Sequence, residues 1–437
     1  MKRFIIFATI LALTNCAKSN NADLDTVDYS ASVDYTIPAE VALAELNNVL
    51  KASPEITKSS DNITFSSINP IYFETPTKST ERDNSPKLYV VDFSNGGSAI
   101  LGADYRAPGV LAILDEGTIT EEDFKKSALY YNTKSKIDNR YPKDNDLVLP
   151  VSKENFPAFL ASYFQEYVET QIDNNDLKTK SSTIYYDGKT WTTDEYIPRL
   201  LNTIWGQWAP FNNAVNILHP GCPVGCVATA LGQILNYCQY PSQIRTLTLD
   251  WDAIGNVYTY SNGVFNAGTS SEQVAVSNML LYIGTDVNMD YDTSGSGATD
   301  DAAVSAMQYY GFSWVQKHTW ANIGNSMDYY VKNCLREYRP AYYGGMHMFN
   351  LFNWTGHVWV VDGLWTMHSG NETMEWYRVN FGWTGSHNGW YSIGVFNPSS
   401  GMHDYDTDEG DLYLPNNEMA TRQYNHWNVA ITYTLPE

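Results

Sequence analysis

The sequence predicts an α+β protein in which two regions are joined by a polar linker, and three observations support this prediction. Apolar residues recur at helical spacing in residues 38–53 and 155–172. Residues 87–117 have the pattern of strands around a tight turn. Residues 173–182 are polar and lack apolar periodicity, and tryptophan and tyrosine become frequent after them. With 437 residues, of which 43% are hydrophobic, the chain is long enough for two domains.

The first region is expected to fold as a compact domain of helices and strands. The apolar stripe of its first helix consists of Leu43, Leu46, Val49 and Leu50. Two apolar runs then flank the turn Asn95-Gly96-Gly97, which is a hairpin signal, and a further strand ends at Asp115. This region contains no cluster of the residue types that carry out catalysis.

The net charge of the chain excludes one large class of partners. The formal net charge is −22, and no stretch of the sequence concentrates lysine and arginine. Because binding to a phosphate backbone needs a concentrated basic surface, a nucleic-acid partner is not expected. The acidity is typical of a soluble protein in salty surroundings.

The N-terminus has the form of an export signal. Lys2 and Arg3 precede an apolar run over residues 4–13, which is too short to span a bilayer. The run ends in a box that resembles the cleavage site of bacterial lipoproteins, in which Cys16 would be lipidated and become the first mature residue. Asn15 departs from the small residue usual before that cysteine. An exported protein leaves the reducing cytosol, so disulfides are allowed.

Residues 226–238 are predicted to form a helix that ends before Pro241. Their apolar positions follow the i, i+3, i+4, i+7, i+8, i+11 spacing of one helix face. Cys238 lies on this stripe and is expected to be a core thiol. Cys226 stands at the start of the helix, directly after Gly225, where free backbone N–H groups and the helix dipole stabilise a thiolate. Cys226 is therefore the candidate nucleophile.

The other cysteines leave several readings open. Cys222 and Cys226 have a spacing that zinc sites use, but no second pair of cysteine or histidine at short spacing follows them, so no metal is expected. A disulfide between these two residues would silence the nucleophile. Cys222 would otherwise pair with Cys334 or stay free.

A nucleophilic cysteine needs a base, and His357 has the most suitable context among the eight histidines. Gly356 precedes it, and residues 358–361 read as a buried strand closed by an Asp362-Gly363 turn. A histidine at the mouth of a core strand is held rigidly, as a general base must be. Farther along, residues 377–398 predict a strand, a loop rich in glycine and tryptophan, and another strand.

Several segments, in this order and spacing, resemble the streptopain-like cysteine peptidases, a bacterial branch of the papain-like fold. The segments are "GCVATALGQILNYCQYP", "TGHVWVVDG" and "VNFGWTGSHNGWYSI", supported by "WGQWAPFN", "YDTSGSGATDDAAVSAMQYYGF" and "RPAYYGG". The stretch "FSNGGSAILGADYRAPGVLAILDEG" resembles the inhibitory propeptide of that family. The resemblance covers roughly residues 35–435.

The resemblance implies the division of the chain. Residues 1–16 would be a lipoprotein-type signal peptide, and residues 17–182 an α+β inhibitory propeptide domain with its linker. Residues 183–437 would be a papain-like peptidase domain, with a helical part and an antiparallel β part. The propeptide is expected to cover the cleft and to be cut near residues 178–182.

The resemblance also implies the roles of individual residues. Cys226 matches the nucleophile, and His357 matches the base that activates it and later protonates the leaving amine. Gln207 matches the side-chain donor of the oxyanion hole, with the backbone N–H of Cys226 as its partner. Trp383 matches a tryptophan of the active-site loop.

Phe381 departs from the family pattern, and Asn380, Ser296 and Gly297 have two readings each. Phe381 stands where the family usually has a tryptophan beside the histidine, so the packing that orients His357 is expected to differ. Asn380 would orient His357, or it would be a buried amide paired with backbone. Ser296 and Gly297 would line the substrate cleft, or belong to a plain surface loop.

The expected function is an exported bacterial cysteine endopeptidase that is made as a zymogen and needs no metal or organic cofactor. Its partners would be protein or peptide substrates, and its own propeptide would inhibit it intramolecularly. It would be an outer-membrane or cell-surface lipoprotein anchored through lipidated Cys16, or be secreted after processing. The alternatives are a Cys/His amidase or transglutaminase-like acyl transferase, against which the propeptide-like region argues, and an inactive surface binding protein that uses its many aromatic side chains.

Overall fold

The computed structural model describes residues 35–54, 63–73, 85–131, 147–176, 189–261, 264–319, 327–348, 353–396 and 426–436. Tyr35–Glu437 forms one compact unit. The signal-like residues 1–16, with Cys16, and the expected cleavage segment 178–182 lie outside the described residues. Within the described ranges, no helix combines the length and apolar character needed to cross a membrane.

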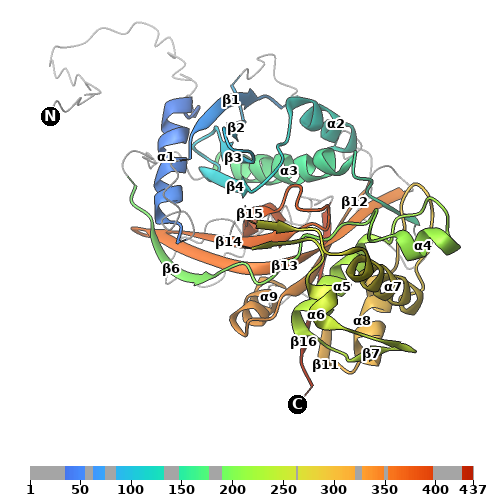
Figure 1. Ribbon diagram of the computed structural model, residues 1–437. Coiled ribbons are helices and arrows are strands. Elements are labelled where there is room, and N and C mark those ends of the chain that lie inside the picture. The colour runs from blue at the N-terminus through green and yellow to red at the C-terminus, as the bar shows by residue number, and fades with distance from the viewer. Residues whose placement is uncertain are drawn as a thin grey trace, which may run out of the picture. The chain divides into compact units, whose positions relative to one another are not determined.

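The N-terminal elements agree with the predicted helices and hairpin (Figure 1). They are α1 (Ala39–Ala52), β1 (Phe65–Ile71), β2 (Leu88–Phe93), β3 (Ser98–Gly102), β4 (Val110–Leu114), α2 (Glu121–Tyr131), β5 (Leu147–Pro150) and α3 (Phe156–Asp176). The predicted turn joins β2 to β3, and its Gly96 and Gly97 have φ values of 96° and 77°, a region that favours glycine. Helix α3 continues to Asp176, four residues into the segment that lacks apolar periodicity.

The C-terminal elements are a group of helices followed by long strands. They are β6 (Thr192–Ile197), α4 (Asn213–Leu218), α5 (Cys226–Cys238), β7 (Gln243–Ile244), β8 (Leu247–Thr248), α6 (Trp251–Gly255), β9 (Thr259–Ser261), β10 (Val264–Asn266), α7 (Ser270–Asp286), α8 (Asp300–Tyr309), β11 (Ser313–Thr319), α9 (Met327–Arg336), β12 (Ala341–Met348), β13 (Asn353–Ser369), β14 (Glu372–Asn380), β15 (Gly389–Ser392), α10 (Ile393–Phe396) and β16 (His426–Thr434). The predicted helix at residues 226–238 is confirmed in both bounds as α5.

One sheet runs through both regions. Its described strands follow the order β1-β2-β3-β4-β15-β14-β13-β12-β16-β11, and β5 and β6 pair with β13. The joint between the regions is the antiparallel pairing of β4 with β15, in which Leu114 lies opposite Gly389. Arg378 on β14 reinforces the joint by an ion pair with Asp115, directly after β4.

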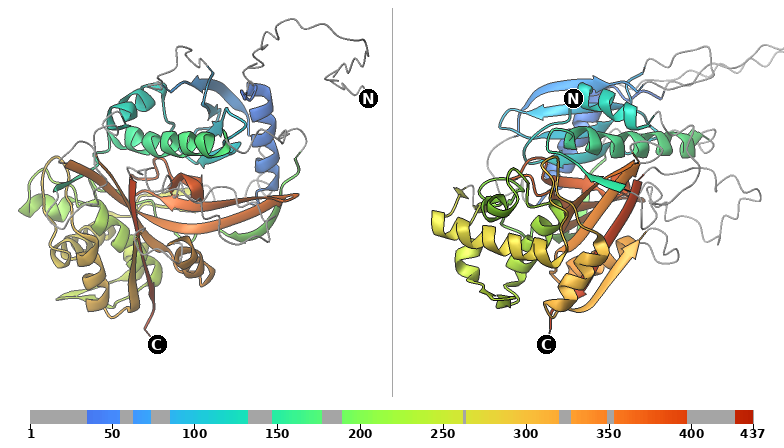
Figure 2. Two further views of the ribbon diagram at one scale, coloured as in Figure 1. Left: turned by 180° about the vertical axis from the view of Figure 1, so that it is seen from behind. Right: turned by 90° about the vertical axis from the view of Figure 1, so that its right-hand side faces the viewer.

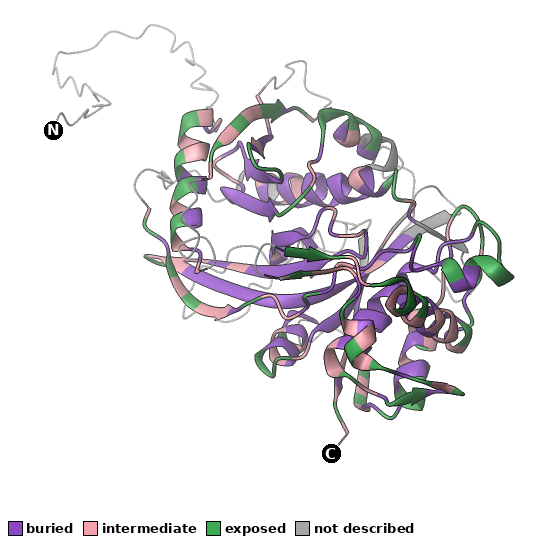
Figure 3. Ribbon diagram, viewed as in Figure 1, coloured by how far each residue is buried: buried purple, intermediate pink, exposed green. Residues whose placement is uncertain are grey.

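The two faces of β13 pack against different parts of the chain. Val358 and Val360 pack into a cluster built around α5 and α7. Trp359 and Val361 pack into a second cluster, which includes the apolar side of α3. Figures 1 and 2 show α3 on one side of these strands and α5 on the other, and Figure 3 shows how completely the strands between them are buried. A third cluster packs α1 against β2–β4.

The predicted turn at Asp362-Gly363 is wrong, because β13 continues through it to Ser369. The pairing with β14 shifts register between Val361 and Gly363, which marks a β-bulge. A Cβ at Gly363 would lie 2.7 Å from Cβ of Arg378 and 3.0 Å from O of Ile197. Neighbouring strands on both sides therefore require glycine here. Asp-Gly is typical of turns and of bulges alike, and the local sequence does not separate the two.

The joint between the regions can be tested at Gly389. A Cβ at this position would lie 2.3 Å from O of Ile113 on β4. We expect Gly389→Ala to push β4 away from β15 and to lower the free energy of unfolding by about 1–3 kcal/mol, as overpacking does. Urea unfolding of the chain carrying Cys226→Ala measures this. Gly255→Ala is the matched control, because its Cβ would meet its nearest neighbour at an ordinary 3.4 Å. Equal midpoints for the two variants would contradict the prediction.

Candidate active site

Gly225 shapes the entry into α5 and presents Cys226 as the first helical residue. Its φ is 88°, which favours glycine, and a Cβ would lie 2.7 Å from Sδ of Met289 and 2.9 Å from O of Ser296. The loop after α7 therefore packs directly against the turn before the helix.

The thiol of Cys226 is buried and protonated at neutral pH. Burial raises its pKa to about 11, while backbone N–H groups of Val358, Val227 and Cys226 itself act in the opposite direction. The sequence argument expects the helix start to favour a thiolate. In this arrangement loss of hydration outweighs that effect.

Gln207 places a hydrogen-bond donor that has no acceptor beside the turn before Cys226. Its backbone O accepts from N of Val224 at 2.9 Å, which ties residue 207 to the turn before Cys226. Its side chain is buried, and Nε2 has no hydrogen-bond partner. A buried donor without a partner costs about 1–3 kcal/mol, so Nε2 would gain a hydrogen bond if an acceptor oxygen reached it.

His357 is neutral, and its Nδ1 lone pair is available. Its Nε2 lies 2.8 Å from backbone O of Phe381. A carbonyl oxygen only accepts, so Nε2 carries the proton, and Nδ1, which is buried without a partner, is the unprotonated nitrogen. Burial lowers the pKa of the imidazole to about 4.

Aromatic rings enclose the imidazole. Trp383 stacks on it at 5.1 Å between ring centroids with 12° between the planes. Phe156, at the start of α3, contacts it edge-on at 5.1 Å and also contacts Trp383 and Phe381. The sequence analysis missed Phe156, because a phenylalanine on a helical apolar stripe looks like any core residue.

Cys226 contacts the residue that follows His357, but the thiol and the imidazole do not form a hydrogen bond with each other. The thiol interacts with the N–H of Val358, the residue after His357. Successive side chains of a strand point to opposite faces. The His357 ring accordingly lies with Phe156 and Trp383, on the face that α3 covers, and no hydrogen bond joins it to Cys226. The geometry is that of a latent site.

Asn380 makes no contact with His357. Its Nδ2 donates to O of Thr203 at 2.8 Å and to Oε1 of Gln233 at 3.1 Å, and its Oδ1 accepts from N of Gly382. These bonds fix the loop after β14. The group that positions the carbonyl facing His357 is Asn388, whose Oδ1 accepts from N of Phe381 at 2.9 Å. The sequence analysis did not single out Asn388.

Ser296 supports the turn before α5, and Gly297 lies beside it in the same loop. The buried hydroxyl of Ser296 donates to O of Pro223 at 2.7 Å. Gly297 pairs with Asp290 in an isolated antiparallel bridge. Ser296 therefore holds the segment that carries Cys226, whereas Gly297 stabilises the loop that carries Ser296.

The described cysteines are Cys222, Cys226, Cys238 and Cys334, and each is a free thiol. Cys238 lies 3.6 Å from the hydroxyl of Tyr433 between α5 and β16. In the described part of the chain, no group of three or more histidine, cysteine, aspartate or glutamate side chains is placed to hold a metal ion.

A cysteine at the start of a buried helix, a histidine on the antiparallel sheet packed against it, and a free amide donor define a papain-like cysteine peptidase. Residues 205–391 match the Peptidase C10 family. Streptopain of Streptococcus pyogenes serotype M1 is 24% identical over 356 residues, 72% of this chain and 75% of streptopain. The thiol protease/hemagglutinin PrtT of Porphyromonas gingivalis is 28% identical over 234 residues, 47% of this chain and 25% of that protein.

A solved structure extends the likeness to the N-terminal region. A fragment of prointerpain A from Prevotella intermedia has a TM-score of 0.50 and 20% identity, and the match covers 86% of this chain and 100% of the fragment. At this identity the likeness is one of fold. The chain is a cysteine-type peptidase, a hydrolase that acts on protein or peptide substrates, and it is similar to streptopain and, in fold, to a proenzyme fragment.

Because Phe156 helps to bury His357, we expect its removal to change the pKa of the imidazole. In Phe156→Ala, water reaches the imidazole, so its pKa should rise from about 4 toward the ordinary 6.5. NMR titration of the His357 ring protons in the chain carrying Cys226→Ala measures this directly. Phe159→Ala is the control, since its ring contacts Phe156 and Tyr163 but not His357. If the two variants titrate alike, Phe156 does not bury the imidazole.

The lowered pKa of His357 also determines how the stability of the enclosed arrangement changes with pH. The buried ring has a lower pKa than an exposed one, so the enclosed arrangement loses up to about 3 kcal/mol as the pH falls from 6.5 to 4. Asp362, whose pKa is raised to about 6 by burial, changes stability with the opposite sign over that range. The titration of His357 is therefore a cleaner measurement than global unfolding.

Proposed function

We propose that the chain is the latent precursor of an endopeptidase in which Cys226 is the nucleophile, His357 the base and Gln207 an oxyanion donor. The observation that carries this proposal is the pair of unused buried groups, Nδ1 of His357 and Nε2 of Gln207. Each belongs to a segment in backbone contact with the Cys226 region, through Val358 or through Val224. One is a proton acceptor and the other a hydrogen-bond donor, which are the two functions that thiol acyl transfer requires.

The reaction follows from these groups once the thiol and imidazole meet. Nδ1 of His357 takes the thiol proton, and sulfur attacks the peptide carbonyl carbon. The resulting oxyanion accepts hydrogen bonds from Nε2 of Gln207 and from N–H of Cys226. His357 then returns the proton to the leaving amine as the C–N bond breaks. Water, deprotonated by His357, hydrolyses the thioester and releases the second product.

Latency is proposed to arise from the position of the imidazole. Phe156 of the propeptide holds one edge of the ring, and Phe381 O fixes its Nε2. Departure of α3 would remove this enclosure and let the start of β13 rearrange so that the imidazole reaches Cys226. The β4–β15 pairing and the Arg378–Asp115 ion pair hold the propeptide in place until then.

Processing and export complete the proposal. The propeptide would span residues 17–182, the peptidase domain residues 183–437, and the cut would fall near residues 178–182. Residues 1–16 would direct export. Lipidation of Cys16 would anchor the precursor, so the cut would release the peptidase domain while the propeptide stayed at the membrane.

The first experiment is a time course of intact mass for residues 17–437 under mild reductant, compared with Cys226→Ala. We expect the wild-type chain to lose its first domain and the variant to stay whole. Cys238→Ala is the matched control, because this thiol lies on the same helix and should leave processing intact. If the Cys226→Ala chain processes itself at the wild-type rate, Cys226 is not the nucleophile.

Gln207→Ala tests the oxyanion donor. Removing one such donor typically lowers kcat by about 10²–10³-fold, with little change in KM, because the bond forms only in the transition state. Hydrolysis of a fluorogenic peptide by trypsin-trimmed enzyme gives both constants. Gln316→Ala, an exposed residue of β11, is the control. A fall in kcat of less than a few-fold would remove Gln207 from the oxyanion hole.

A further inference from the structure

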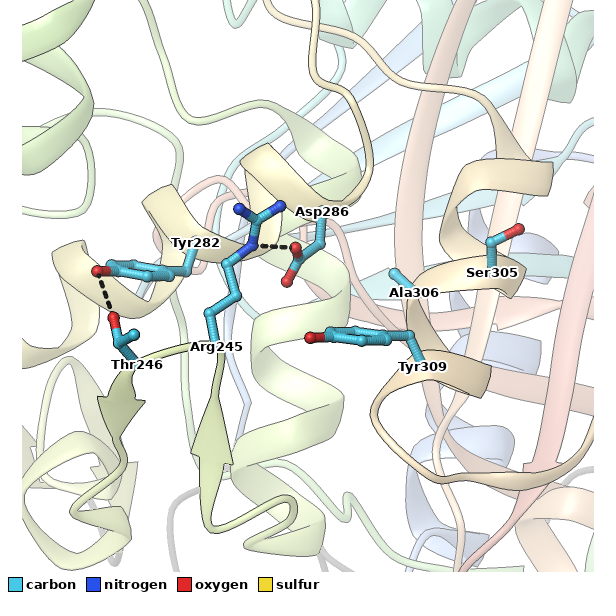
Figure 4. A pocket seen from close by; sticks show the side chains of 7 residues that line it. All are labelled: Arg245, Thr246, Tyr282, Asp286, Ser305, Ala306 and Tyr309. Carbon is cyan, nitrogen blue, oxygen red and sulfur yellow. Dashed lines mark hydrogen bonds and ion pairs between the residues drawn. The ribbon is translucent and has the colours of Figure 1, made fainter.

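A cavity of about 760 Å³ lies among α7, α8 and the turn between β7 and β8. Figure 4 shows the seven side chains that line it: Arg245, Thr246, Tyr282, Asp286, Ser305, Ala306 and Tyr309. None of them belongs to the candidate active site, and the proposed reaction uses none of them.

The guanidinium of Arg245 is fixed in place but keeps donors available. Its Nε donates to Oδ1 of Asp286, and the other oxygen of this buried carboxylate accepts from the Tyr310 hydroxyl at 2.9 Å. Both oxygens of Asp286 are therefore occupied within the protein. The two terminal nitrogens of Arg245 make no hydrogen bond to the described residues, so a pair of donors remains on a guanidinium that is held through Nε.

Arg336 is a comparison for Arg245, because it has the same exposure and uses its donors differently. Its side chain has the same 44% exposure as that of Arg245. Arg336 uses both Nε and Nη2 on the two oxygens of Glu195 and donates from Nη1 to Asn333. Its donors are satisfied internally, whereas those of Arg245 are not.

The backbone and the neighbouring rings favour a binding role for Arg245. Its φ of 52° lies in the region that favours glycine, at a tight turn where glycine or asparagine is usual. Tyr282 and Tyr309 present rings from two different helices, and Tyr309 is 68% exposed (Figure 4). The cavity thus combines two aromatic surfaces with a planar fork of donors.

We propose that this cavity is a binding site for a carboxylate-bearing peptide segment, an acidic side chain or a C-terminal carboxylate. The carboxylate would accept two parallel hydrogen bonds from the terminal nitrogens of Arg245, the geometry that guanidinium and carboxylate share. The adjoining apolar atoms of the ligand would pack on Tyr282 and Tyr309. Asp286 cancels part of the local positive charge and no second cation lines the cavity, so a monoanion fits better than a doubly charged phosphate.

Benzoate is the probe, because it joins a carboxylate to an apolar ring. Titration into the full chain carrying Cys226→Ala, followed by ligand-observed NMR at low salt, should give a Kd on the order of 1–10 mM. Benzamide, the neutral isostere, and phenylphosphonate, a dianion, are the comparison ligands and should bind at least about tenfold more weakly, the loss that one charge-assisted hydrogen-bond pair produces. Because the active-site thiol is absent, the result does not depend on the proposed catalytic roles.

Three variants locate the binding. Arg245→Gln should weaken benzoate by about tenfold or more, and Arg245→Lys should restore part of the affinity because it keeps the charge but loses the fork. Arg336→Gln, at equal exposure, should bind benzoate as the parent does. The proposal is overturned if the parent chain does not bind benzoate, if Arg245→Gln binds it as tightly as the parent, or if phenylphosphonate binds more tightly than benzoate.

Discussion

The pairing of β4 with β15 is the constraint on which the rest of this structure depends. Backbone hydrogen bonds between strands allow few alternative registers, and a shift by one residue would turn buried side chains outward. Once Leu114 lies opposite Gly389, the position of the propeptide relative to β13 and β14 is fixed. Helix α3 then lies over the sheet so that Phe156 reaches the imidazole of His357. The latent site is in this sense a consequence of sheet geometry.

Burial shifts the pKa values of Cys226 and His357 so that both groups of the latent site are neutral. Burial raises the pKa of Cys226 to about 11 and lowers that of His357 to about 4, so both groups are neutral over the physiological range. Both shifts disfavour a thiolate–imidazolium pair. Exposure of the cleft would lower the first pKa and raise the second, and both changes favour transfer of the proton from sulfur to nitrogen. A single structural event would thus change both pKa values in the direction that the proposed reaction needs.

Local sequence patterns correctly predicted the helices and turns that neighbouring residues determine. The helix from Cys226 to Cys238 follows from its apolar spacing, and the hairpin at Gly96-Gly97 follows from its turn residues. The bulge at Gly363 was misread as a turn, because only the flanking strands distinguish the two. The contact of Phe156 with His357 joins residues about 200 positions apart, and no periodicity encodes it. The same holds for Asn388, whose role depends on the backbone of Phe381.

Removal of the propeptide would also change the status of β15. In the precursor this strand is internal, with β14 on one side and β4 on the other. Without β4 its free backbone groups would lie at the rim of the sheet, where another chain can add a strand and aggregation can begin. Two features would limit this hazard. The strand β15 is short. Removal of the propeptide would also separate Arg378 from its partner Asp115 and leave the charge of Arg378 near this edge. A propeptide in this position would therefore also cover the edge of the sheet and protect the solubility of the enzyme while it folds.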